Sequence, residues 1–148
     1  MMETLGSLCD KLTIVKLKQW HTEDNIRQES LSKQEIQLSN EIDSYLANAL
    51  NGEIPLENLK FSSNKVYKSK GNEIREISGF SIGVVFSELA QVNCDLWHEQ
   101  ENVYEFELVP VEQKNEVVKN LAKMNLERNS CIDKIDSLLY KIIEERIK

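Results

Sequence analysis

The chain has 148 residues, a length typical of a single domain with one hydrophobic core. It contains five glycines and two prolines, a composition that favours long helices over short strands joined by turns. The net charge of −7, without a clustered basic face, argues against a grip on nucleic-acid phosphates. No apolar run approaches the roughly 20 residues of a membrane span, and the first residues do not resemble a signal peptide. We therefore expect a cytoplasmic, all-α protein that binds neither nucleic acid nor a membrane.

Hydrophobic periodicity predicts two helices in the first half of the chain. Apolar residues recur at steps of three and four from Glu3 to about Gln28, which indicates the first helix. The second is expected to start at Ser32-Lys33-Gln34-Glu35, because Ser-x-x-Glu spacing is typical of a capping box. It should end near Asn51, with Gly52 as its stop signal.

The apolar pattern of the second half predicts another pair of helices, which follows a long connection. From Gly52 to Gly79 the helical pattern is lost, except for a helical turn expected at Leu56 to Leu59. A third helix is expected from near Ser81 to about Tyr104. A fourth should run from Val111 to Lys148, with Pro110 in its first turn. The long connection is the expected place for a lid or a partner contact.

A repeated Trp-His pair divides the chain into two similar halves. Each of its two tryptophans precedes one of its two histidines, in Trp20-His21 and Trp97-His98. Ile42-Asp43-Ser44 is matched by Ile135-Asp136-Ser137, after extra residues in the second half. We therefore predict a four-helix bundle formed by two similar helical hairpins. It would be one domain, 1–148, with a pseudo-repeat of 3–51 and 80–148 and a connection of 52–79.

The candidate binding residues surround the two Trp-His pairs. Residues three and four apart share a helix face, so His21 is expected beside Asp24, and His98 beside Glu101. An approximate two-fold axis between the halves would bring both clusters into one cleft. The candidate ligand-binding residues, with no metal ligand and no catalytic residue assigned, are Trp20, His21, Asp24, Trp97, His98, Glu101, Asn125 and Arg128.

Three functions remain open for these clusters. The first is a cleft for a small anionic ligand, which convergence of Lys11, Arg75 and Arg128 would mark. The second is a metal-dependent enzyme that uses paired His and carboxylate groups, although bundle metal sites use the order Glu-x-x-His. The third is a structural or inhibitory bundle that binds a protein partner or itself. In that case Trp would fill the core and His would bond an acid on its own helix.

The cysteines weigh against an enzyme. The chain has three cysteines, an odd number, and they are widely spaced and embedded in apolar helical patterns. They are Cys9, Cys94 and Cys131. We expect buried free thiols rather than disulfides or metal ligands. No residue pattern marks an activated nucleophile, and the sequence does not identify a cofactor.

The second half resembles a known family. The segments are Asn93-Cys94-Asp95-Leu96-Trp97-His98-Glu99-Gln100-Glu101, Leu126-Glu127-Arg128-Asn129 and Ile132-Asp133-Lys134-Ile135-Asp136. They resemble uncharacterised bacterial proteins grouped as domain of unknown function 4254. That family pairs a Leu-Trp-His-x-Glu-Asp segment with an Asn-x-x-Arg-Asn-x-x-Ile-Asp segment. This chain has Gln100-Glu101 where the family has Glu-Asp.

The opening segment points in a related direction. Leu5-Gly6-Ser7-Leu8-Cys9-Asp10-Lys11-Leu12-Thr13-Ile14 is similar to the start of small proteins that accompany glycosyltransferases in bacterial surface-glycan clusters. Both resemblances imply a bacterial or phage origin, an all-α structure and a link to glycan or nucleotide-sugar metabolism, without naming an activity. We therefore expect a binding or accessory protein for an anion of nucleotide or nucleotide-sugar type.

Overall fold

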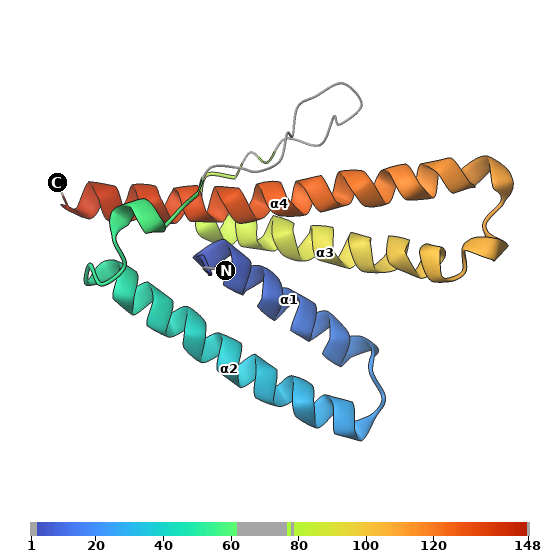
Figure 1. Ribbon diagram of the computed structural model, residues 1–148, viewed down its shortest axis with the longest axis horizontal. Helices are drawn as coiled ribbons and strands as arrows, with labels where there is room; N and C mark the ends of the chain where they lie inside the picture. Colours follow the sequence, from blue (N-terminus) through green and yellow to red (C-terminus); the bar gives the residue numbers. More distant parts are fainter. Residues whose placement is uncertain (1–2, 62–76, 78, 148) are drawn as a thin grey trace.

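The computed structural model describes residues 3–61, 77 and 79–147, and the regular secondary structure of this part is helical. Its elements are α1 (Leu5–His21), α2 (Asn25–Leu50), η1 (Leu56–Asn58), α3 (Ile82–Tyr104), η2 (Phe106–Leu108) and α4 (Val111–Ile147). Figure 1 shows two antiparallel hairpins, α1 with α2 and α3 with α4. The predicted bundle of two helical hairpins is confirmed. No helix of the described part is both long and apolar enough to cross a membrane.

The boundary between α1 and α2 differs from the predicted single helix over 3–28. α1 ends at His21, and the carboxylate of Asp24 accepts two backbone N–H hydrogen bonds from the first turn of α2. An aspartate that satisfies these N–H groups stabilises a new helix start. The predicted start at Ser32 is therefore wrong, because Ser32 lies inside α2.

The other helix ends agree with the prediction. α2 is followed by Gly52, whose φ of 84° lies in the left-handed region that glycine adopts readily. The turn expected at 56–59 is η1. Ser81 caps α3 by accepting a hydrogen bond from the Val84 N–H, and α4 begins at Val111. Lys148, the predicted end of the last helix, lies outside the described residues.

α1, α3 and α4 enclose most of the core, whereas α2 packs mainly on α1. Figure 1 shows α1 lying between α2 and the α3–α4 hairpin. α2 contributes Leu31 and Ala49 near its two ends. The buried core of the other three helices is formed by Leu5, Cys9, Val85, Leu89, Val92, Leu96, Cys131, Ile135, Leu139 and Ile143. α2 is thus the most peripheral helix.

The two hairpins begin in the same way. Thr4 caps α1 and Ser81 caps α3, at the spacing that separates the two Trp-His pairs. The second residue of each helix is a glycine, Gly6 or Gly83. The ends differ, because α1 stops at its Trp-His pair and α3 continues beyond its own. The structural repeat is therefore strongest at the helix starts.

α1 meets α4 in a close contact at Gly6. A Cβ atom at this position would lie 2.4 Å from the carbonyl oxygen of Ile132, so only glycine fits. The Gly6 N–H donates to Oδ1 of Asp136 at 2.7 Å. Burial raises the pKa of Asp136 to about 6, although hydrogen bonds from Gly6 and Thr4 act in the opposite direction.

This raised pKa predicts that protonation of Asp136 stabilises the fold. The carboxyl binds its proton up to about pH 6 in the folded state, but only up to about 3.8 in the unfolded chain. Its stabilising contribution is complete below the unfolded value and is lost as the pH rises through 6. Urea denaturation should therefore show that the free energy of unfolding falls by about 1 kcal/mol between roughly pH 5 and 7.

Two variants check this assignment. Asp136→Asn is expected to flatten the fall, because the amide does not titrate. Asp95→Asn changes an exposed aspartate of α3 and should keep the wild-type pH dependence. An equally steep fall in Asp136→Asn would contradict the assignment.

Candidate functional site

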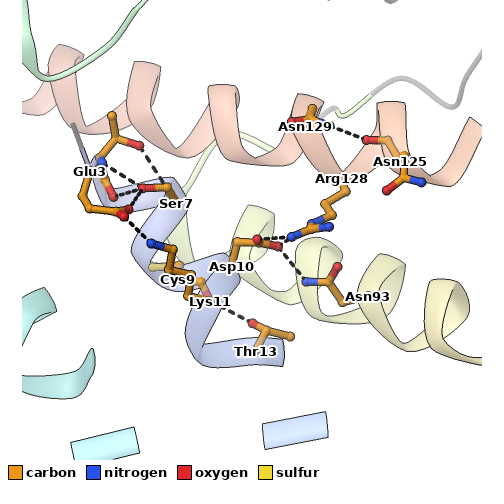
Figure 2. Close-up of polar contacts among 11 residues, drawn as sticks. Glu3, Ser7, Cys9, Asp10, Lys11, Thr13, Asn93, Asn125, Arg128 and Asn129 are labelled. Carbon is orange, nitrogen blue, oxygen red and sulfur yellow. Dashed lines mark hydrogen bonds and ion pairs between the residues drawn. The ribbon is translucent and has the colours of Figure 1, made fainter. Parts of the chain in front are cut away.

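An ion pair between a buried aspartate and a half-buried arginine joins α1 to α4. Asp10 of α1 is 5% exposed, and both of its carboxylate oxygens accept hydrogen bonds from Arg128 of α4 (Figure 2). Arg128 Nε lies 2.8 Å from Oδ1, and Nη2 lies 2.5 Å from Oδ2. A planar guanidinium and a planar carboxylate match in this bidentate form, and the bonds to Asp10 raise the pKa of Arg128.

Asn93 of α3 brings a third helix to the same carboxylate. Its Nδ2 donates to Asp10 Oδ1 at 3.0 Å, and the residue is 1% exposed. Its Oδ1 is buried without a hydrogen-bond partner in the described part of the chain. An unsatisfied buried acceptor costs about 1–3 kcal/mol, which is unusual in a region that serves packing alone.

A cleft of about 560 Å³ opens beside this ion pair between α1, α2 and α4. Asp10 and Arg128 lie in its wall together with Lys11, which also pairs with Glu3. Lys11 and Arg128 line the same cleft, each paired with a carboxylate of its wall, whereas Arg75 lies outside the described residues, so the expected convergence of all three stays a prediction. The remaining lining residues of the cleft are Glu3, Ile14, Val15, Lys18, Gln34, Gln37, Leu38 and Glu41.

A second cleft, of about 520 Å³, shares Lys18 and Gln34 with the first and lies at the end of α1. Among the described residues, its lining includes two cations, Lys18 and Arg27, and no carboxylate. Neither side chain forms an ion pair in the described ranges. Its other lining residues are His21, Thr22, Ser30, Leu31 and Trp97. This is a local excess of positive charge in a chain of net charge −7.

An aromatic stack forms one wall of the second cleft. The rings of His21 and Trp97 have centroids 4.6 Å apart and planes at 20°. His21 Nδ1 lies 2.8 Å from the carbonyl oxygen of Leu17, which orients the imidazole. The structure thus brings one ring from each Trp-His pair together.

The other halves of the two pairs face away from this stack. Trp20 is 85% exposed, so the expectation that both tryptophans fill the core is wrong for this residue. His98 is exposed, and its Nδ1 lies 2.8 Å from the carbonyl oxygen of Cys94. The expected bonds to acids of the same helix are therefore replaced by bonds to backbone carbonyls one helical turn earlier.

The remaining candidate residues have separate surroundings. Asp24 caps α2 and is not on a shared helix face with His21, because α1 has already ended. Glu101 lines a smaller cleft that includes the same aromatic stack. Asn125 donates from Nδ2 to the carbonyl oxygen of Leu121. Of the candidates, His21, Trp97 and Arg128 line the two connected clefts.

Four residues of the clefts and of the polar cluster beside them were missed from the sequence. They are Asp10, Lys18 and Arg27, which line the clefts, and Asn93, which donates to Asp10. Asp10 and Asn93 carried a usable signal, because each polar side chain interrupts a run of apolar residues. A buried polar group needs a partner, so this position alone indicates a hydrogen bond across helices. Lys18 and Arg27 had no comparable signal on exposed helix surfaces.

The described residues do not gather into a site for a metal ion or a reactive thiol. Within residues 3–61, 77 and 79–147, no group of three or more His, Cys, Asp or Glu side chains lies close enough to hold a metal. Cys9 and Cys131 are buried free thiols, and Cys94 is half-buried. Burial raises the pKa of Cys9 to about 12, with Asp136 and Asp10 adding to the effect, so it stays a thiol at neutral pH.

Comparisons with known proteins found no match in any of three sets: family models, curated proteins and solved structures. The resemblance to domain of unknown function 4254 stays a prediction from the sequence. The chemistry of the two connected clefts is therefore the basis for a functional proposal.

Breaking the buried ion pair should destabilise the bundle. Arg128→Met would leave the Asp10 carboxylate buried without its counter-charge, and we expect a loss of about 2–3 kcal/mol in the free energy of unfolding. Urea denaturation measures this loss. Lys11→Met is a matched control that removes the exposed pair with Glu3, and it should cost less than about 1 kcal/mol. Equal losses in the two variants would show that the buried pair has no special structural role.

Proposed function

We propose that this protein binds a small anionic ligand that joins phosphate to an aromatic ring, as a nucleotide does. One observation carries the proposal, namely the cleft at the end of α1. It combines two cations, no described carboxylate and a wall of stacked aromatic rings. Such a combination favours an anion that also has a flat apolar surface.

The positive side chains suit a phosphate group. Lys18 and Arg27 extend from α1 and α2, and neither is neutralised by an ion pair in the described part. A guanidinium donates to two phosphate oxygens at once, and an ammonium adds a compact charge. Thr22, Ser30 and Gln34 add hydroxyl and amide donors to the same lining. These groups together complement a phosphate in charge and in hydrogen bonding.

The aromatic wall suits a nucleobase. His21 and Trp97 stack on each other and both line the cleft, so its wall offers flat aromatic surface, which supports this assignment. Offset contacts between aromatic rings contribute about 0.5–1.5 kcal/mol beyond the area that they bury. The wall therefore favours nucleotides over inorganic phosphate.

The neighbouring cleft gives room for a longer ligand. This cleft of about 560 Å³ shares the lining residues Lys18 and Gln34 with the aromatic cleft and is also lined by Arg128. Gln37 and Glu41 in its lining supply groups that donate to or accept from hydroxyls. A nucleotide sugar would place its base on the aromatic wall, its phosphates at Lys18 and its sugar in this neighbouring cleft, beside Gln37 and Glu41.

A protein-binding role is the second candidate, favoured by exposed apolar side chains near the hairpin turns. Such side chains are more than two-thirds exposed at both turns, and clusters of this kind mark contact surfaces. They are Trp20, Ile26, Tyr104, Leu108 and Val111. The third candidate, a metal-dependent enzyme, has no comparable cluster of ligands in the described part.

Binding of ADP and UDP-glucose tests the nucleotide proposal. Both compounds should raise the melting temperature in a thermal-shift assay, because a ligand of the native state stabilises it by mass action. By calorimetry, Lys18→Ala and Arg27→Ala should each weaken binding at least about tenfold, by roughly 1.4 kcal/mol. Lys16→Ala, on an exposed position of α1 outside both clefts, is the matched control and should bind as the wild type does. If neither compound binds, the proposal is wrong.

The fluorescence of Trp97 reports whether the nucleobase of the ligand binds beside this residue. Trp20→Phe removes the exposed tryptophan, so that the remaining signal comes from the cleft. We expect ADP to quench this signal and inorganic phosphate to leave it nearly unchanged, because phosphate has no ring to stack. Quenching that is equal for both compounds would place the base away from Trp97.

A further inference from the structure

The glycine and the aspartate of the α1–α4 contact recur in α3 and α2. In this structure the recurring pair does not form the matching contact. In α1, the Gly6 N–H donates to Asp136, and α4 approaches too closely for any side chain at Gly6. The matching glycine of α3 is Gly83, at the same position after the cap. A Cβ atom on Gly83 meets no atom within 4 Å, and its N–H has no partner in the part of the chain that the structure describes.

The other half of this contact is exposed on α2. The repeat places Asp43 of α2 at the position of Asp136 in α4. Asp136 is buried, whereas Asp43 is exposed. Two helical turns further on, Ile143 of α4 is 4% exposed and Leu50 of α2 is 55% exposed. Asp43 and Leu50 of α2 therefore repeat two residues of the docking face of α4, but they are uncovered. Ile42 and Leu46 of the same helix are half-buried and pack against the core of their own chain.

These two halves cannot meet within one chain. α1 lies between α2 and α3 (Figure 1). Leu31 and Ala49 are buried near the two ends of α2, which packs mainly on α1. Movement of α2 onto α3 would uncover both residues and break the first hairpin.

We propose that a second copy of this chain completes the contact, with the start of α3 from one copy packed on the outer face of α2 of the other. The chemistry is complementary, because α3 has no acid in its first turn and Asp43 supplies the negative charge that a helix start favours. Phe80 and Val84, which are 90% and 52% exposed, flank Gly83 and would be covered with Leu50. Two-fold symmetry gives two equal contacts and a closed dimer.

This interface is separate from the clefts of the proposed function. Asp43, Leu50 and Gly83 do not line either of the two connected clefts. Self-association and ligand binding can therefore be measured independently. Failure of one proposal leaves the other unaffected.

Light scattering of the full chain tests the dimer. The wild type should be dimeric at tens of micromolar. Gly83→Ala adds a methyl group where the single chain has open space, so the melting temperature at low protein concentration should not fall. The same methyl group blocks the close contact, and we expect this variant to be monomeric. A monomeric wild type, or a Gly83→Ala variant that stays dimeric, would overturn the proposal.

Two further variants show that the effect is specific. Gly6→Ala places the same methyl group at the contact that the single chain does make, so its melting temperature should fall. Ser87→Ala changes an exposed residue one turn after Gly83 and should remain dimeric. Loss of the dimer in Ser87→Ala would mean that the contact does not depend on Gly83.

Cysteine cross-linking identifies the two surfaces. In a Cys94→Ser background, Val84→Cys protein is mixed with Leu50→Cys protein, because both exposed residues lie in the proposed interface without filling the glycine contact. Diamide serves as the oxidant of the two thiols. The mixture should give a disulfide-linked pair of chains, whereas each protein alone should give much less. If a chain that carries both substitutions forms this disulfide only within itself, α2 closes on α3 of its own chain and the dimer proposal is wrong.

Discussion

The ion pair between Asp10 and Arg128 sets the relative positions of three helices. A carboxylate that is almost fully removed from water must be matched in charge and in geometry, and the bidentate guanidinium meets both needs. Asn93 brings α3 to the same oxygen that Arg128 Nε contacts. Because misaligned helices would leave this charge unpaired, the polar cluster constrains their register.

The contact at Gly6 adds a second constraint along the same helix. Glycine allows α1 to approach the backbone of α4, and Asp136 satisfies the N–H at the start of α1. Together, the two contacts make α1 the central helix of the bundle. α2 is then held by α1 alone for most of its length, and the space between α2 and α4 is left as the first cleft. The same constraints that order the core therefore produce the candidate site.

The similar halves of the sequence do not give a symmetric structure. The two hairpins share their caps and their glycines, but α4 is longer than α2 and α3 extends past its Trp-His pair. One of the two equivalent helix contacts forms within the chain, between α1 and α4, and the other leaves Gly83 and Asp43 uncovered. This asymmetry separates the roles of the repeated residues. His21 and Trp97 stack in the cleft, while Trp20 and His98 face solvent.

The sequence by itself determined the helical class, the two hairpins and most helix ends, because these follow from local periodicity, caps and glycine. It did not determine the break at Asp24, where a local cap competes with a continuing helical pattern. Only the tertiary structure decided that Asp10 pairs with Arg128 and that His21 stacks on Trp97. These partners lie far apart along the chain, and their contact depends on how the helices cross, which no short-range pattern records.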